Sequence, residues 1–267
     1  MSTTIAVLSQ KGGTGKTTTV RTLTDVFRRI GLSVLAVDLD PQGNLSDYLD
    51  VDPDASPTIG DVLSGRAKPR DAIHDGIIPA NLGLAESELA LGGKMGRELT
   101  LKKALREVAG DYDLVLIDCP PALGLLTVNA LVASDYALLS AEAQYFALQG
   151  VEQALEVIEL ARDSLNPDLQ WLGVVLNIAD MRTRHSREAF DSLRQHFGDK
   201  LVETTIRPSI AYAESAERAM SILDYRPDLG ADYLTVADEL LKRLGIDKPR
   251  TRLRELVRSS QPAQASA

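Results

Sequence analysis

Residues that build disulfide scaffolds, cysteine-bound clusters and membrane spans are scarce in this sequence. Its 267 residues include one cysteine, Cys119, so the chain alone forms no disulfide and no cysteine-ligated cluster, as expected in a reducing compartment. The longest apolar runs, such as residues 114–117 and 172–176, are far shorter than the roughly 20 residues that cross a bilayer. The first residues also lack a basic segment followed by a long apolar stretch, and we therefore expect a cytoplasmic protein.

Positive charge is in deficit overall but concentrated near the end of the sequence. The chain has 29 lysines and arginines against 38 aspartates and glutamates, a formal charge of −9. This balance argues against a protein that coats nucleic acid with its whole surface. Residues 242–258 nevertheless hold seven basic and two acidic side chains. A confined basic patch therefore remains compatible with the composition.

Short apolar, β-branched runs alternate with helical patterns along the chain. Buried strands are predicted at residues 5–8, 34–37, 114–117, 136–139 and 172–176. Helices are predicted at residues 16–30, 99–108, 125–133, 150–162 and 187–197. This alternation predicts a doubly wound α/β fold with a mostly parallel sheet and helices on both faces. We expect one domain over residues 1–248, with a loop at residues 50–57, and a basic, then low-complexity, tail over residues 249–267.

A glycine-rich segment, SQKGGTGKTT (residues 9–18), follows the first predicted strand and opens the first predicted helix. Glycines let a backbone turn tightly enough for successive N–H groups to face phosphate oxygens, and the helix N-terminus adds its positive dipole end. In such a loop Lys16 reaches the β- and γ-phosphates of ATP, and the Thr17 hydroxyl ligates Mg²⁺. A simple threonine-capped turn is the alternative, but Gly-Lys-Thr between a strand and a helix favours a phosphate loop. The predicted nucleotide-binding residues here are Lys11, Gly12, Gly13, Thr14, Gly15, Lys16, Thr17 and Thr18.

Carboxylates follow two of the predicted strands. Asp38 and Asp40, in VLAVDLDPQG (residues 34–43), are two residues apart and point to the same side of the strand end. Asp118, in LVLIDCPP (residues 114–121), follows four apolar residues, the Walker B arrangement. An aspartate at the carboxyl edge of a parallel sheet is well placed to face the water shell of Mg²⁺.

The phosphate loop departs from the strict Walker A pattern at its start. Gln10 stands where that pattern has glycine, and an additional lysine, Lys11, follows it. Together with the D-x-D-P-Q-G segment, the loop resembles the deviant Walker A family of ATPases, which includes ParA, Soj, MinD and the nitrogenase iron protein. The similarity to ParA and Soj extends over residues 4–244.

The resemblance implies specific roles for the lysines and carboxylates. Lys11 reaches across a dimer interface to the phosphates of the partner's nucleotide, and Asp40 orients the attacking water. The implied catalytic residues are therefore Lys11, Lys16 and Asp40. The implied magnesium site comprises Thr17, Asp38 and Asp118. Because a cation from a second subunit makes nucleotide binding and dimerisation mutually favourable, we expect an ATP-dependent homodimer.

Later segments resemble family segments near the base and the dimer interface. IRPSIAYAES (residues 206–215) resembles I-P-R-N-V-x-L-x-E-A, which packs on adenine, and this implies base contacts from Arg207, Pro208 and Ser209. Asn177 ends a strand where relatives often place an adenine-contacting residue, although a hydrogen-bonded turn residue is equally compatible. YFALQG (residues 145–150) resembles part of E-Y-Y-A-L-E-G, but Gln144 and Gln149 replace the family's acids.

Arginines gather in MRTRHSR (residues 181–187). This stretch resembles the region in which Soj-like proteins bind duplex DNA without reading its sequence. Because Glu188 and Asp191 follow closely, a solvated charged face is the alternative reading. The residues predicted to bind DNA are Arg182, Arg184, Arg187 and Arg218.

The resemblance implies a nucleoid-associated ATPase that positions chromosomes or plasmids together with a ParB-type centromere-binding partner. Reductases of the nitrogenase type need clustered cysteines, which Cys119 alone excludes, and no separate small-molecule site of a dethiobiotin synthetase type stands out. The main alternative is a MinD-like ATPase acting on a membrane or on another cargo. A lipid anchor is not favoured, because residues 249–258 offer only Leu253, Leu256 and Val257 as an apolar face.

Overall fold

A computed structural model describes residues 2–260. Its sheet has six parallel strands in the order β3-β2-β4-β1-β5-β6. Their apolar residues are buried because helices cover both faces of the sheet. The strands are β1 (Thr3–Leu8), β2 (Val34–Asp38), β3 (Ile77–Ile78), β4 (Leu114–Asp118), β5 (Tyr136–Glu142) and β6 (Gln170–Asn177).

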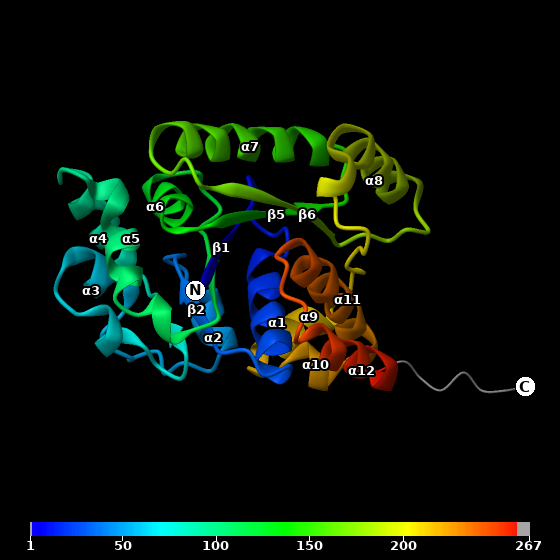
Figure 1. The fold of residues 1–267 in the computed structure, drawn as a ribbon, viewed down its shortest axis with the longest axis horizontal. Coiled ribbons are helices and arrows are strands. Elements are labelled where there is room, and N and C mark those ends of the chain that lie inside the picture. The colour runs from blue at the N-terminus through cyan, green and yellow to red at the C-terminus, as the bar shows by residue number, and fades with distance from the viewer. Residues whose placement is uncertain (1, 261–267) are drawn as a thin grey trace, which may run out of the picture.

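Two layers of helices enclose this sheet (Figure 1). The helices are α1 (Lys16–Arg29), α2 (Asn44–Tyr48), α3 (Ile59–Ser64), α4 (Gly83–Leu91), α5 (Thr100–Arg106), α6 (Leu125–Ala133), α7 (Ala147–Ser164), α8 (Arg184–Phe197), α9 (Ala211–Glu217), α10 (Ile222–Tyr225), α11 (Pro227–Arg243) and α12 (Arg250–Ser260). Short 3₁₀ helices occupy Pro69–Ala72, Arg97–Leu99, Ala109–Asp111 and Gly198–Lys200.

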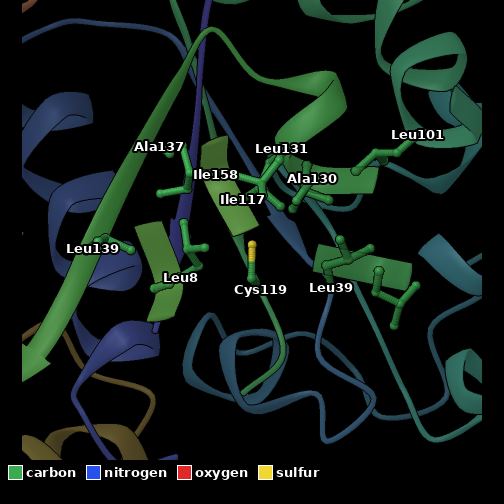
Figure 2. Close-up of a cluster of buried hydrophobic side chains, with 14 of the residues drawn as sticks. Leu8, Leu39, Leu101, Ile117, Cys119, Ala130, Leu131, Ala137, Leu139 and Ile158 are labelled. Atoms are coloured by element: carbon green, nitrogen blue, oxygen red, sulfur yellow. The ribbon is translucent and has the colours of Figure 1, made fainter. Parts of the chain in front are cut away.

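Each face of the sheet has its own apolar core. One core combines residues of α3 to α8 with one side of the strands, and the other combines α1, α11 and α12 with the opposite side. Figure 2 shows part of the first core, in which Leu8, Leu39 and Ile117 lie near Cys119. The Cys119 side chain is fully buried, and burial raises the pKa of its thiol well above the usual value.

The predicted α/β fold with a parallel sheet is confirmed. All five predicted strands and the five predicted helices exist, with ends shifted by a few residues, and residues 50–57 are loop. The edge strand β3 was not predicted because its two residues, Ile77 and Ile78, are too few to show a pattern. The predictions also missed α11, although its buried positions, among them Tyr233, Val236 and Leu240, follow helical spacing.

The segment after α11 folds back onto the domain. Its helix α12 packs against α11, with the Leu253 side chain fully buried. The Arg250 guanidinium donates to both carboxylate oxygens of Asp238 on α11, at 2.8 and 3.1 Å. The last residues of the predicted tail, 261–267, lie outside the described part of the chain. Among residues 2–260, no helix combines the length and the apolar character needed to cross a bilayer.

Candidate functional site

The loop between β1 and α1 lies at the carboxyl edge of the sheet, where parallel α/β folds place their ligand sites. Gly13 and Gly15 have left-handed backbone angles, with φ of +78° and +81°, which glycine adopts without steric cost. A Cβ atom on Gly15 would lie 3.3 Å from the Asn177 side chain. Helix α1 begins at Lys16, so the positive end of its dipole opens at this loop. The local geometry is that of an anion site.

Asp118 and Asp38 end neighbouring strands and are paired in the β2–β4 register. The Thr17 hydroxyl donates to Asp118 Oδ2 at 2.6 Å, and the other oxygen, Oδ1, is buried without a donor from residues 2–260. Burial raises the pKa of Asp118 to about 6, against the opposing effect of the Lys16 charge. A buried carboxylate oxygen without a donor, next to a threonine hydroxyl, is well suited to accept a hydrated cation.

Asp38 is buried beside it but has many donors. Its Oδ2 accepts hydrogen bonds from the Ser46 amide at 2.9 Å and the Ser46 hydroxyl at 2.8 Å, and its Oδ1 accepts one from the Asp40 amide at 3.1 Å. Burial, and then the charge of Asp118, raises the pKa of Asp38 to about 7, while the Ser46 bonds oppose this shift. Asp38 therefore holds the turn after β2, and its predicted place in the magnesium shell stays a prediction.

No group of three or more His, Cys, Asp or Glu side chains that could hold a metal exists within residues 2–260. Mg²⁺ often binds proteins through only one or two carboxylates, with phosphate oxygens and water completing its octahedron. Thr17 and Asp118 match such a partial shell, because each would need oxygens from a bound phosphate nearby. The residues present thus fit a metal that arrives with a nucleotide.

Asp40, two residues after Asp38, is also buried. Its Oδ1 accepts a hydrogen bond from the Gln42 amide at 3.0 Å, and its side chain lines the same pocket as Lys16 and Thr17. The carboxylate is thus near the phosphate loop, while its backbone bond to Asp38 fixes the turn that carries it.

A pocket of about 750 Å³ extends from the phosphate loop to α9 and α11. It unites most of the predicted nucleotide-binding residues, which come from chain segments more than 150 positions apart. The predicted residues that line it are Gly12, Gly13, Gly15, Lys16, Thr17, Thr18, Asn177, Arg207, Pro208 and Ser209. Thr14 does not line it: this residue is buried, and its carbonyl accepts a hydrogen bond from the Ser140 hydroxyl at 2.8 Å.

Asn177 is almost fully buried at the back of this pocket. Its amide nitrogen donates to the Ser140 hydroxyl at 2.8 Å and to Thr19 Oγ1 at 3.4 Å, and its oxygen faces the Tyr233 hydroxyl at 3.5 Å. These bonds tie β5, β6, α1 and α11 together behind Gly15. They match the hydrogen-bonded alternative, and a contact with the base stays a prediction.

Two of the other residues predicted near the base have partners within the chain. The Arg207 Nε donates to Asp232 of α11 at 2.8 Å, and Ser209 Oγ accepts a hydrogen bond from the Ala211 amide at 3.2 Å. Both residues are thereby held at the rim of the pocket, and their predicted contacts with a base are untested.

Sequence reasoning missed three tyrosines that line the pocket, Tyr48, Tyr212 and Tyr233. The rings of Tyr212 and Tyr233 pack edge to face with centroids 6.1 Å apart. The Tyr212 hydroxyl oxygen is buried without a hydrogen-bond partner from residues 2–260. Tyr212 lies within the 206–215 segment, and the resemblance of that segment is the signal that could have found it, whereas Tyr48 and Tyr233 come from helices that were not predicted.

Lys11 is placed differently from the rest of the loop. Its side chain is exposed and does not line the large pocket; its Nζ lies 5.5 Å from the centre of the Phe146 ring. The two loop lysines therefore differ in environment, because Lys16 is only 6% exposed and lies inside the pocket.

The predicted DNA-binding arginines come from two parts of the surface. Arg182, Arg184 and Arg187 are exposed and lie at or just before the start of α8. The Arg182 guanidinium donates twice to Asp180 at 2.9 Å, and Arg184 Nε donates to Glu188 at 2.6 Å. Arg218 follows α9, with its guanidinium carbon 5.0 Å from the centre of the Tyr225 ring. The structure thus groups the first three, and DNA binding by any of them remains a prediction.

A family model, curated proteins and solved structures all resemble this chain over most of its length. A family model described as "AAA domain" matches residues 2–171. The sporulation initiation inhibitor protein Soj of Bacillus subtilis is 38% identical over 245 residues, covering 88% of this chain and 97% of that protein. The chromosome partitioning protein ParA of Caulobacter vibrioides is 37% identical over 250 residues, covering 90% and 94%. A solved structure named cobyrinic acid a,c-diamide synthase from Mycobacterium smegmatis, with bound ADP and magnesium, has a TM-score of 0.74 and 37% identity, covering 86% of this chain and 94% of that one.

Proposed function

Because this chain belongs to the family of the Soj and ParA chromosome-partitioning ATPases, we propose that it is an ATP-driven dimerisation switch for DNA segregation. In this proposal the ATP-bound dimer binds duplex DNA without reading its sequence, and a ParB-type partner stimulates hydrolysis and release. The observation that carries the proposal is the contrast between the two loop lysines. Lys16 lies inside the pocket with Thr17 and Asp40, whereas Lys11 lies outside it on an exposed surface.

ATP and Mg²⁺ fit the residues of the pocket. Gly13 and Gly15 open the loop to phosphates, Lys16 supplies a cation next to them, and Thr17 with Asp118 offers oxygens to the magnesium shell. When bound, the metal neutralises phosphate charge. The protein's own part is to fix these groups beforehand: Asp118 through Thr17, and Asp40 through its bonds to Asp38 and Gln42. Asp40 then orients a water for attack on the terminal phosphate.

The exposed position of Lys11, outside its own subunit's pocket, suits a contact with a second subunit. Since its ammonium does not line its own subunit's pocket, it can meet the nucleotide of a second subunit across a shared face. Each ATP would then attract the partner's lysine, so nucleotide binding and dimerisation would strengthen each other.

We expect Lys11→Ala to retain ATP binding within a few-fold, because Lys16 stays in the pocket, but to lose ATP-dependent dimerisation. Binding is measured by nucleotide titration at protein concentrations that keep the chain monomeric, and dimerisation by light scattering with a non-hydrolysable ATP analogue. Lys103→Ala, which removes an exposed lysine from α5, is the control and should behave as the parent. Equal losses of nucleotide affinity in Lys11→Ala and Lys16→Ala would contradict the trans role.

DNA binding is assigned to the arginines at the start of α8. Arg182 and Arg184 are 91% and 84% exposed, but each is paired with a neighbouring carboxylate. Exposed pairs of this kind are weak, so phosphates of a duplex can displace Asp180 and Glu188. Because the chain as a whole is acidic, a few arginines per subunit hold DNA best when a dimer presents two such groups together.

We expect the double substitution Arg182→Glu and Arg184→Glu to abolish ATP-dependent binding to random-sequence duplex while leaving dimerisation intact. Parent binding should weaken as salt rises, since phosphate contacts release counterions. The matched control is Arg66→Glu with Arg70→Glu, which reverses two other exposed, carboxylate-paired arginines with the same change of charge. Binding to labelled duplex is measured by fluorescence anisotropy at low salt. Tight binding by the nucleotide-free monomer, or equal losses of binding in both double variants, would refute this assignment.

The packing of α12 counts against the alternative of a MinD-like role on a membrane. Leu253 is fully buried, and Leu256 and Val257 pack against the core of the domain. The apolar side chains that would enter a lipid surface therefore already have partners inside the protein. Co-sedimentation with lipid vesicles and with DNA, each with and without ATP, distinguishes the two roles.

A further inference from the structure

The side chain of Lys11 rests on an aromatic ring of its own subunit. Its Nζ lies 5.5 Å from the centre of the Phe146 ring, within the range of a cation–π contact. The backbone at Lys11 is held as well, because the Ser9 hydroxyl donates to the Lys11 carbonyl oxygen at 2.7 Å. The loop and the start of α7 also pack together: a Cβ on Gly150 would lie 3.6 Å from the Gln10 side chain.

The ring that receives the ammonium lies on the surface and packs against a second exposed ring. Phe146 and Tyr145 pack edge to face, with centroids 5.0 Å apart and an interplanar angle of 87°. Their side chains are nevertheless 56% and 84% exposed. The exposure of these two large aromatic side chains to water is unfavourable for the monomer. One of them, Phe146, presents its π face to Lys11.

Carboxylates do not compete with this ring for Lys11. The residue at position 144 is an amide, and the Gln144 Nε2 donates to one oxygen of the Glu142 carboxylate, Oε1, at 2.7 Å. Within residues 2–260, Lys11 forms no ion pair within 4.0 Å. A cation–π contact at an exposed site is weaker than a buried ion pair, so a strongly charged phosphate can take the lysine away from the ring.

We propose that Phe146 is a positioning residue for Lys11: its ring holds the ammonium in the monomer until a second subunit presents bound phosphates. The proposal rests on the dimerisation switch proposed above. It adds that Lys11 leaves the Phe146 ring when it binds the phosphates of the second subunit. Dimerisation then breaks one contact in each subunit, and the ring sets the ATP-bound dimer's threshold concentration. A matched pair of variants tests it: Phe146→Leu removes the π face but keeps an apolar side chain, and Phe146→Tyr keeps the ring.

The contact itself is tested in the nucleotide-free monomer by NMR with ¹³C-labelled lysine. The Lys11 ε-methylene signal, assigned by its disappearance in Lys11→Arg, should be shifted upfield by the ring. Phe146→Leu should move it to the position of a solvated lysine, and Phe146→Tyr should restore the shift. The same Lys11 signal in the parent and in Phe146→Leu would overturn the proposal whether or not the protein dimerises.

The consequence is tested by dimerisation with Mg²⁺ and a non-hydrolysable ATP analogue. Each cation–π contact favours the monomer by a few-fold, and the parent must break two of them, one in each subunit, to dimerise. Phe146→Leu lacks these contacts and should therefore dimerise about 5- to 30-fold more tightly than the parent, whereas Phe146→Tyr should be unchanged. Equal or weaker dimerisation of Phe146→Leu, with the ring shift present in the parent, would show that Phe146 serves the interface and would overturn the positioning role. If the parent shows the ring shift but never dimerises with the analogue, the proposed switch fails instead, and the positioning role falls with it.

Discussion

Lys16→Ala is expected to lower ATP affinity by at least about 100-fold. Lys16 is the loop lysine inside the pocket, at the start of α1 and beside the Thr17–Asp118 pair. Hydrogen bonds to charged groups contribute about 1.5–3 kcal/mol each, so losing contacts to two phosphates corresponds to about 3 kcal/mol or more. The affinity is measured by isothermal titration with ATP and Mg²⁺.

A control variant and a folding measurement make this result specific. Lys103→Ala removes an exposed lysine of α5 and should leave affinity unchanged, which controls for the loss of one positive charge. Thermal unfolding of Lys16→Ala without nucleotide should show a single cooperative transition, so that lost binding is not lost folding. ATP affinity within a few-fold of the parent in a folded Lys16→Ala would contradict the phosphate-loop assignment.

The second large effect is expected at Asp40. Asp40→Ala should bind ATP and Mg²⁺, because Lys16, Thr17 and Asp118 remain, but should hydrolyse ATP about 100-fold or more slowly, the usual contribution of a positioned acid–base group. Because the nucleotide is then retained, the variant should accumulate as an ATP-bound dimer in size-exclusion chromatography. Steady-state phosphate release gives the rate.

Asp40→Asn separates the charge of this residue from its role in the turn. Asparagine keeps a side-chain oxygen that can accept the Gln42 amide hydrogen bond seen at 3.0 Å but lacks the carboxylate. If the carboxylate orients water, Asp40→Asn should be as slow as Asp40→Ala. Normal turnover in Asp40→Asn with slow turnover in Asp40→Ala would assign Asp40 to the turn alone, and normal turnover in both would remove it from the mechanism.

Local patterns predicted the fold, and they predicted which chain segments meet at the carboxyl edge of the sheet. The loop of residues 9–18 and the carboxylates at the ends of β2 and β4 each follow a buried strand, so the parallel sheet alone brings Lys16, Asp40 and Asp118 to one edge. Their proximity needed no knowledge of side-chain packing.

The part of the pocket that α2 and α11 line could not be predicted in the same way. Tyr48 comes from a five-residue helix, too short for a periodic signal, and Tyr233 sits in α11, whose place beside α1 depends on long-range packing. The donors to Asp38 were equally hidden, because Ser46 meets that carboxylate only after the turn has folded. The contact between Lys11 and Phe146 joins positions 135 residues apart, and the sequence carries no sign of it.

The burial of Cys119 has a practical consequence for following this protein in solution. Its side chain is fully buried, and burial raises the pKa of its thiol, which keeps it protonated. Alkylating dyes react with exposed thiolates, so they should not label Cys119 while the protein stays folded. A cysteine introduced on an exposed position, such as Arg66 on the surface after α3, would therefore be the single labelling point in an otherwise unaltered chain. Mixing donor- and acceptor-labelled batches would then test by energy transfer whether two chains associate, with the natural thiol left in place.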